Sequence, residues 1–325
     1  MVRVLTGDIF RSGAQTLVNT VNCVGVMGKG IALEFKRRFP EMYRDYVVRC
    51  GARQVRLGEP YLFRGPSPPW VLNFPTKDHW RSVSNLADIV AGLEYLERHY
   101  EAWGITSLAV PPLGCGQGQL EWRVVGPTMY RHLIGLAIPV EFYAPPGTPR
   151  PQMEEDFLLG ASEPRESQSP SVEGSRIDPA WIALVEILAR IDREPYHWPV
   201  GRTTFQKLAY FATEAGLPTG LRHSRGSYGP FAADLKQITS RLVNNGLVQE
   251  QRLGRMLAVK PGPTYRDAAQ AFACQLTEWE APIARTADLI LRMRTEQAEM
   301  AATVHFAAQD MQRRTKHRPT ECEVL

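Results

Sequence analysis

Residues 19–39, NTVNCVGVMGKGIALEFKRRF, constrain the fold of this chain more than any other stretch. A β-branched strand leads into a loop with three glycines, and an amphipathic helix follows, with Ile31, Phe35 and Phe39 on one face. Glycines let a backbone approach a phosphate closely, and the first N–H groups of the helix point toward it. The spacing is that of neither a dinucleotide fingerprint nor a P-loop. The stretch therefore predicts either another kind of anion site or a plain strand-to-helix turn.

Length and composition fit two soluble domains. The chain has 325 residues, 44% of them hydrophobic, which suggests roughly two domains. No apolar run approaches the ~20 residues of a membrane helix, and the N-terminus lacks a signal-peptide pattern. The five cysteines form no CxxC pair, so neither a disulfide framework nor a zinc site is expected. We predict a cytoplasmic protein that needs no metal or cofactor.

The first 150 residues alternate predicted strands with predicted helices. The strands are expected at 2–9, 16–21, 62–63, 70–74, 105–111 and 139–143, and the helices at 31–39, 41–50, 86–103 and 121–136. This alternation is typical of an α/β domain with a largely parallel or mixed sheet.

The unusual residues of this domain each follow a predicted strand. They are Asp8, the loop 22–30, Lys77 and the second glycine loop, 114–119. The carboxyl ends of strands in an open α/β sheet meet at one edge, where ligands bind. Two facing glycine loops suggest a diphosphate held by backbone amides. Asp8 only accepts hydrogen bonds and so suits an exocyclic amine such as that of adenine, although it is also a common turn residue.

The remainder of the chain changes character twice. Residues 151–178 are rich in proline, serine and acidic residues and predict a flexible linker, in which only 157–159 are apolar enough to dock. From residue 179 the pattern is helical, and a hairpin at 247–259 turning at Gly254 suggests a winged helix. Two more helices are expected over 266–314, followed by a frayed tail. Residues 176–325 hold 20 Lys and Arg against 16 Asp and Glu, which does not support DNA mimicry by negative charge.

Several motifs resemble those of macrodomains, the fold that binds ADP-ribose. They are Gly7-Asp-Ile9, Asn19-Thr-Val-Asn22 with its glycine loop, and Val110-Pro-Pro-Leu-Gly-Cys-Gly116. Asn73-Phe-Pro-Thr-Lys77 is similar to the branch whose glycohydrolases use a lysine. With its long second domain, the chain resembles the DarG family, the antitoxins of DarTG toxin–antitoxin systems. These remove the ADP-ribose that the toxin DarT places on thymidine in single-stranded DNA.

The resemblance implies an architecture and a function. Residues 1–150 would be an α/β macrodomain with a mixed sheet flanked by helices. Residues 179–325 would be a mainly helical, winged-helix-like domain that binds a DarT-like toxin. ADP-ribosylated single-stranded DNA would be the substrate and ADP-ribose the product. Ser227-Tyr-Gly-Pro-Phe231, after Phe205-Gln-Lys-Leu-Ala-Tyr210, resembles the Panacea domain of SocA-like antitoxins.

Other functions stay open. The chain is alternatively a protein that binds ADP-ribose without cleaving it, or a protein mono-ADP-ribosyl hydrolase. In either case the C-terminal domain would bind DNA.

The resemblance also implies site residues. Lys77 would be catalytic, and Asp8 would hold the adenine amine beside the amide of Ile9. The residues implied to bind ADP-ribose are Asp8, Ile9, Asn19, Thr20, Asn22, Gly25, Met27, Gly28, Gly30, Ile31, Pro112, Leu113, Gly114, Cys115, Gly116, Gln117 and Gly118. Relatives that act on protein carboxylates carry an aspartate near the position of Gly118. Its absence places more of the chemistry on Lys77.

Three further points concern chemistry. Lys77 can attack the anomeric carbon as a neutral amine, which requires a lowered pKa, or it can stay protonated and donate to the departing thymine. Cys23 and Cys115 have no obvious histidine partner and are expected to be packing residues. His79 and Trp80 either stack a nucleobase, as aromatic side chains on loops do for single strands, or Trp80 caps the core.

Overall fold

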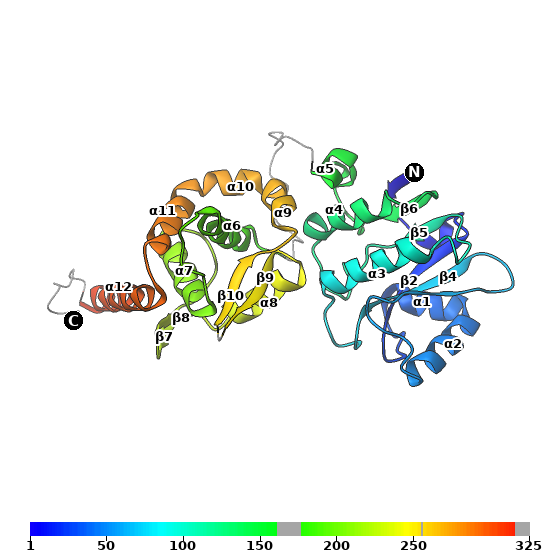
Figure 1. Ribbon diagram of the computed structural model, residues 1–325, viewed down its shortest axis with the longest axis horizontal. Helices are drawn as coiled ribbons and strands as arrows, with labels where there is room; N and C mark the ends of the chain where they lie inside the picture. Colours follow the sequence, from blue (N-terminus) through cyan, green and yellow to red (C-terminus); the bar gives the residue numbers. More distant parts are fainter. Residues whose placement is uncertain (161–176, 255, 316–325) are drawn as a thin grey trace. The chain divides into compact units, whose positions relative to one another are not determined.

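The computed structural model describes residues 1–160, 177–254 and 256–315, which form two compact units (Figure 1). Within the described residues, the N-terminal unit comprises residues 1–160 together with Asn244–Gly246, and the C-terminal unit begins at Ile177 and comprises the rest. Among these residues, no helix combines the length and apolar character that crossing a membrane requires.

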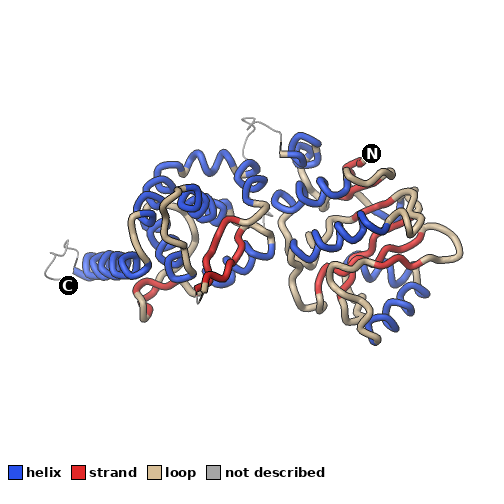
Figure 2. The backbone as a smooth tube through the Cα atoms, viewed as in Figure 1, coloured by secondary structure: helices blue, strands red, loops and turns tan. Residues whose placement is uncertain are grey.

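A six-stranded mixed sheet forms the centre of the N-terminal unit (Figure 2). Its spatial order is β1-β6-β5-β2-β4-β3. Neighbouring strands are parallel, except that β3 runs antiparallel to β4. The strands are β1 (Val2–Leu5), β2 (Thr16–Asn22), β3 (Tyr61–Phe63), β4 (Trp70–Lys77), β5 (Leu108–Val110) and β6 (Val140–Tyr143).

Helices cover both faces of the sheet, which confirms the predicted mixed sheet flanked by helices. On one face, Phe35 of α1 (Gly30–Arg38) and Tyr46 of α2 (Pro40–Gly51) share a buried cluster with Leu17 of β2. On the other face lie α3 (Leu86–His99) and α4 (Trp122–Leu133), where Trp122 packs against Phe142 at a ring-centroid distance of 5.1 Å. A short 3-10 helix, η1 (Ile9–Arg11), follows β1.

Strand β4 is longer than the sequence predicts. The expected strand ended at residue 74, before Pro75, whereas β4 continues to Lys77. The neighbouring strand β3 pairs only with Val71–Asn73, so β4 has a free edge at Pro75 on that side, a setting that tolerates proline. Lys77 is therefore the last residue of a strand, in register with Asn22 of β2, and does not lie beyond the strand as expected.

The segment expected to be a linker contains ordered structure at its start. The structure has a 3-10 helix, η2 (Arg150–Met153), and a short helix, α5 (Glu155–Leu159). Leu158 is completely buried and α5 packs against α4, so this apolar segment docks through Leu158, whereas Leu159 is 41% exposed. Residues 161–176 lie outside the described part of the chain.

The C-terminal unit is mainly helical, as predicted, but the described residues 265–315 form four helices where two were expected. Helices α9 and α10 end at the C-cap residues Phe272 and Trp279. Neither position is a glycine or a proline, so the sequence did not indicate these helix ends. The unit contains α6 (Pro179–Arg193), α7 (Arg202–Glu214), β7 (Ser224–Gly226), β8 (Gly229–Phe231), α8 (Leu235–Asn244), β9 (Val248–Leu253), β10 (Met256–Pro261), α9 (Tyr265–Ala271), α10 (Ala273–Glu278), α11 (Glu280–Leu291) and α12 (Thr295–Thr315).

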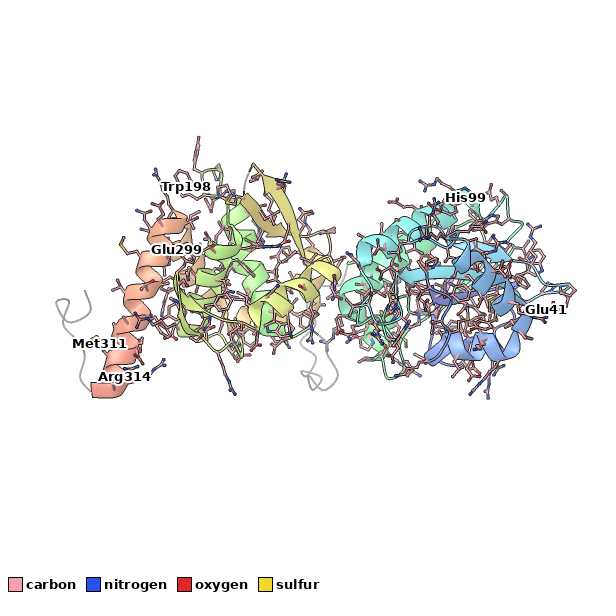
Figure 3. The ribbon with its side chains drawn as sticks, turned by 90° about the horizontal axis from the view of Figure 1, so that it is seen from below. Glu41, His99, Trp198, Glu299, Met311 and Arg314 are labelled. Atoms are coloured by element: carbon pink, nitrogen blue, oxygen red, sulfur yellow. The ribbon has the colours of Figure 1, made fainter. Side chains whose placement is uncertain are left out.

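Two antiparallel hairpins accompany these helices. The predicted hairpin β9–β10 turns at Gly254, whose φ is +60°, and β7–β8 was not predicted. Helix α12 carries Glu299 on its first turns and Met311 and Arg314 on its last (Figure 3). The winged-helix arrangement itself stays a prediction.

Candidate functional site

The first glycine loop is shaped from within by Asn22. Its Oδ1 accepts hydrogen bonds from the backbone N–H of Val24 and from the hydroxyl of Tyr46, each at 3.0 Å. Gly25 has a φ of +80°, a conformation that side chains rarely adopt. Met27 is buried at 2% exposure and anchors the far side of the loop. The loop is therefore held in one shape before any ligand arrives. Tyr46, which was not predicted, reaches it from α2, where periodicity alone indicates only a core residue.

The start of α1 offers backbone donors. Its N-cap residue is Lys29, and within the described residues no side chain caps this helix end. The first N–H groups of a helix lack intrahelical partners, and the helix dipole makes this end attractive to anions. Gly30 and Ile31 lie in this first turn, as the predicted diphosphate contact requires.

The second glycine loop follows β5 and is closed by its own backbone. The N–H of Cys115 donates to the carbonyl of Pro112 at 3.0 Å, and that of Leu120 donates to Gly114 at 3.1 Å. Gly116 and Gln117 are exposed, whereas Leu113 is completely buried and Cys115 is 6% exposed. The loop thus presents its middle to solvent and anchors its flanks in the core.

Lys77 joins the two loops. Its Nζ donates to the carbonyl of Gln117 in the second loop at 3.4 Å and to the carbonyl of Trp80 at 3.3 Å. At the other side, Lys77 is in register with Asn22, at the start of the first loop. Partial burial lowers the pKa of Lys77 below the usual lysine range. The structure therefore brings the predicted catalytic lysine to the edge where both loops meet.

Position 118 has no space for a side chain. A Cβ added to Gly118 would overlap the hydroxyl oxygen of Ser84 and lie 2.5 Å from the carbonyl oxygen of Gly114. Ser84 is itself completely buried, and its backbone N–H donates to Gly118 at 2.9 Å. This packing gives a physical reason for the missing aspartate, because a carboxylate cannot be attached there without moving the loop. Ser84 was not identified from the sequence, where nothing links it to residue 118.

The other predicted residues lie either just past β1 or along β2. Asp8 is exposed just past β1, where its Oδ1 caps η1 by accepting from the N–H of Phe10 at 3.0 Å, and Ile9 is buried behind it. Asn19 is completely buried inside the sheet, where its Nδ2 donates to Oδ1 of Asn73 at 2.9 Å. Thr20 is half-buried on the same strand. The amide nitrogen of Asn19 is thus occupied within the sheet, whereas its buried Oδ1 has no hydrogen-bond partner among the described residues.

Neither thiol chemistry nor metal chemistry is favoured by the described side chains. Burial, with nearby Cys50, Asp78 and Asp88, raises the pKa of Cys23 to about 11, so its reactive thiolate is scarce. Among residues 1–160, 177–254 and 256–315, no group of three or more His, Cys, Asp or Glu is placed to hold a metal ion.

In the C-terminal unit, hydrogen bonds connect the two Panacea-like motif segments, 205–210 and 227–231. The Nζ of Lys207 in α7 donates to the carbonyl of Pro230 at 3.0 Å. The side chain of Gln206 exchanges two hydrogen bonds with the backbone of Ala232, at 3.1 and 3.2 Å. These hydrogen bonds hold the β7–β8 hairpin against α7. Tyr228, at the turn of the hairpin, is 72% exposed.

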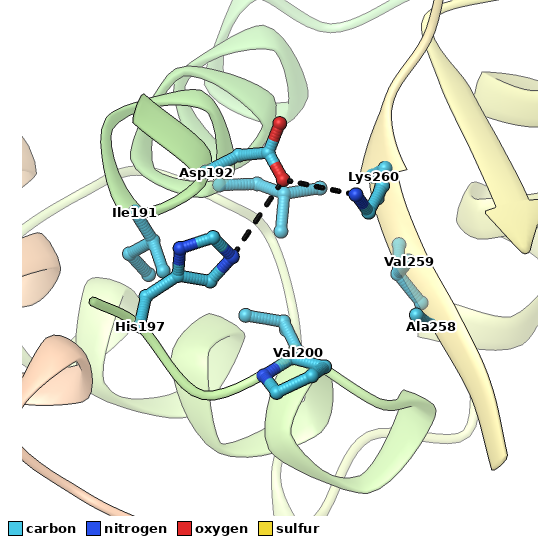
Figure 4. A pocket seen from close by; sticks show the side chains of 9 residues that line it. Ile191, Asp192, His197, Val200, Ala258, Val259 and Lys260 are labelled. Atoms are coloured by element: carbon cyan, nitrogen blue, oxygen red, sulfur yellow. Dashed lines mark ion pairs between the residues drawn. The ribbon is translucent and has the colours of Figure 1, made fainter. Parts of the chain in front are cut away.

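A small pocket in this unit lies apart from those motifs (Figure 4). Its lining is mostly apolar, and Asp192 lies at one side between His197 and Lys260, at 3.8 and 3.6 Å. These three groups pair with one another.

The mixed sheet, the two glycine loops and the start of α1, which no side chain caps among the described residues, define the N-terminal unit as a macrodomain. Residues 18–129 match the family described as Macro domain. The chain is 33% identical to a DNA ADP-ribosyl glycohydrolase of Thermus aquaticus, over 94% of this chain and 82% of that protein. The chain therefore belongs to the DNA ADP-ribosyl glycohydrolase family, the DarG family that its motifs resemble, and is an enzyme of the hydrolase class.

Two further similarities concern the N-terminal half. A DNA ADP-ribosyl transferase–DNA ADP-ribosyl glycohydrolase fusion protein of Thermosipho africanus is 42% identical over 47% of this chain, which spans only 45% of that protein. The solved macrodomain of Mycobacterium tuberculosis DarG is 44% identical, covers 45% of this chain and 98% of its own, and gives a TM-score of 0.43.

Proposed function

We propose that the N-terminal unit binds ADP-ribosylated thymidine in single-stranded DNA, in the cytoplasm, and hydrolyses the N-glycosidic bond between ADP-ribose and thymine. Membership of a glycohydrolase family supports the class of reaction. The observation that carries the proposal is the position of Lys77, whose ammonium group contacts the second glycine loop while its backbone pairs with the start of the first.

ADP-ribose would extend along the carboxyl edge of the sheet. The exposed carboxylate of Asp8 suits the adenine amine, because it can only accept hydrogen bonds. The diphosphate would lie between the start of α1 and residues 114–118, where backbone donors are concentrated. The distal ribose would then reach Lys77, and the thymine would leave from that end.

Lys77 can assist the cleavage by two routes. In the first, the neutral amine attacks the anomeric carbon, thymine departs, and water then releases ADP-ribose from the lysine. In the second, the ammonium donates a hydrogen bond to thymine as the bond breaks, and water adds to the anomeric carbon. Burial favours the neutral amine, whereas the two carbonyl contacts favour the ammonium. The packing of Ser84 under Gly118 argues against a loop carboxylate in either route.

A time course of the full chain with an ADP-ribosylated thymidine oligonucleotide tests this proposal. We expect free ADP-ribose to accumulate over many turnovers, at a rate that EDTA leaves unchanged. Bound substrate with no free ADP-ribose, under conditions where calorimetry confirms ligand binding, would instead identify a protein that binds ADP-ribose without cleaving it.

We further propose that the C-terminal unit binds a DarT-like toxin, so that the protein acts as an antitoxin in two ways. The Thermosipho relative, in which a transferase is fused to the glycohydrolase, supports such a partner. Tyr228 and Phe231 of the β7–β8 hairpin are 72% and 45% exposed, and Met300 and Val304 are exposed on α12, which packs against β8. Aromatic residues and methionine are enriched in protein interfaces.

Toxin binding is tested by co-expressing the toxin with the full chain carrying Lys77→Ala, which removes the repair activity. We expect this variant to protect cells and the double variant Lys77→Ala/Tyr228→Ala to protect them less, at equal expression. If the hairpin change has no effect, the hairpin is not the toxin-binding surface, and the alternative of a DNA-binding C-terminal domain is favoured.

A further inference from the structure

The loop that follows Lys77 carries an exposed aromatic side chain. Trp80 is 46% exposed, so it does not cap the core, in contrast to Trp122 of α4, which is 5% exposed. An aromatic ring exposed on a loop beside the site is available to stack on a nucleobase of a ligand.

Two neighbours frame the Trp80 ring. The guanidinium of Arg81 lies 4.6 Å from the ring centroid, and the imidazole of His79 lies 5.4 Å from it with its plane inclined by 31°. An aromatic ring beside an arginine is the pair that single-strand binding proteins use, since the ring stacks on a base and the cation attracts the phosphate.

The loop is ordered by its own hydrogen bonds. The N–H of Arg81 donates to Nδ1 of His79 at 3.2 Å, and that of Ser82 donates to the carbonyl of His79 at 3.0 Å. The carbonyl of Trp80 accepts from Nζ of Lys77 at 3.3 Å. The ring therefore belongs to a turn that is tied directly to Lys77.

We propose that Trp80 stacks on the nucleobase adjacent to the modified thymidine, with Arg81 attracting the intervening phosphate, so that the enzyme prefers an ADP-ribosylated single strand over an isolated ADP-ribosylated nucleoside. This inference rests on the proposed function. The platform is tolerant of sequence, because every base has a π-face. Stacking on Trp80 requires a single strand, because a base in a duplex would first have to be unpaired and unstacked from its neighbours.

The test compares kcat/KM of the full chain for an ADP-ribosylated thymidine oligonucleotide and for ADP-ribosylated thymidine nucleoside. Trp80→Ala is expected to lower the oligonucleotide-to-nucleoside ratio about tenfold, mainly through KM for the oligonucleotide, and Trp80→Phe to restore most of it. Trp198→Ala is the matched control, because Trp198 is 52% exposed with Arg294 stacked at 4.5 Å, but it lies in the C-terminal unit (Figure 3).

An unchanged ratio in Trp80→Ala overturns the inference, and so does an equal loss on both substrates, which would make Trp80 only a support for Lys77. If the wild type cleaves neither substrate, the proposed function fails separately. The inference is then decided by fluorescence anisotropy with an unmodified, labelled thymidine oligonucleotide. Weaker binding by Trp80→Ala than by the wild type and Trp198→Ala supports it, and equal binding overturns it.

Discussion

Lys77 in the N-terminal unit and Lys207 in the C-terminal unit both have a lowered pKa, but their surroundings differ. Burial lowers the pKa of both. Lys207 is 2% exposed, donates to the carbonyl of Pro230 at 3.0 Å and is influenced by the charge of Glu299, which raises its pKa in part. Lys77 is half-buried and makes two longer contacts, at 3.3 and 3.4 Å, with carbonyls of two loops at the edge of the sheet.

The difference shows that a lowered lysine pKa does not by itself mark a catalytic group. Lys207 fixes the hairpin β7–β8 to α7 inside a unit, where no substrate can reach its ammonium group. Lys77 has comparable electrostatics but lies between two loops whose exposed backbone suits an anion. We therefore expect the surroundings of the lysine, and not its pKa, to distinguish a structural role from a chemical one.

Replacing Lys77 should have the largest effect. Lys77→Ala is expected to lower the single-turnover rate of ADP-ribose release about 100-fold or more, the usual contribution of a group that acts on the reacting bond. Lys77→Arg keeps the charge but not the compact ammonium, and we expect it to stay severely impaired. A rate within a few-fold of the wild type for Lys77→Ala would remove Lys77 from the chemistry.

Replacing Lys207 should affect stability and leave release of ADP-ribose unchanged. Lys207→Ala leaves the buried carbonyl of Pro230 without its donor and removes a packed stem, at a cost of about 2 kcal/mol. Calorimetry of the full chain should show a lowered transition for the C-terminal unit, while ADP-ribose raises that of the N-terminal unit. Lys236→Ala, an exposed lysine on α8, is the control, and equal stability of the two variants contradicts the structural role.

A methyl group at position 118 should weaken ligand binding. Gly118→Ala forces the second loop away from Ser84, and overpacking of this kind costs about 1–3 kcal/mol, so the affinity for ADP-ribose should fall about tenfold. Gly13→Ala, where an added Cβ meets nothing within 4 Å, controls for the loss of a glycine elsewhere in the unit. Calorimetric titration measures both, and unchanged affinity in Gly118→Ala means that the loop is softer than its packing indicates.

The pH dependence of kcat should show the smallest effect. Because two carbonyls hold the Lys77 ammonium, we expect the protonated lysine to be the active form at neutral pH. The rate should then stay level near neutrality and fall severalfold as the pH rises through the lowered pKa of Lys77, below the ordinary value of about 10.4. A rate that rises over this range contradicts this assignment and identifies the neutral amine as the nucleophile.

Local sequence signals predicted those parts of the fold that depend on nearby residues. The period of Ile31, Phe35 and Phe39 predicted α1, and the strand ends predicted the edge where Asp8 and Lys77 lie. Contacts between distant residues carried no such signal. The packing of Ser84 under Gly118 and the pairing of Asn19 with Asn73 become visible only when the strands and loops are assembled.

The end of β4 shows the same limit. Pro75 indicated the end of a strand, but the short neighbour β3 leaves that edge free, so the strand continues to Lys77. Whether a proline fits a strand depends on the length of the adjacent strand, which local sequence does not specify.

The central claim is that Lys77 acts on the bond that is broken and does not hold the ligand. Calorimetric titration of ADP-ribose into the wild type and Lys77→Ala tests this most directly, because an interaction that forms only in the transition state changes the rate and not the ground-state affinity. The account predicts dissociation constants within about threefold of each other, even though release of ADP-ribose is lost. Loss of ADP-ribose binding together with activity, in a variant that calorimetry shows to be folded, would contradict it and make Lys77 a contact for the anionic ligand.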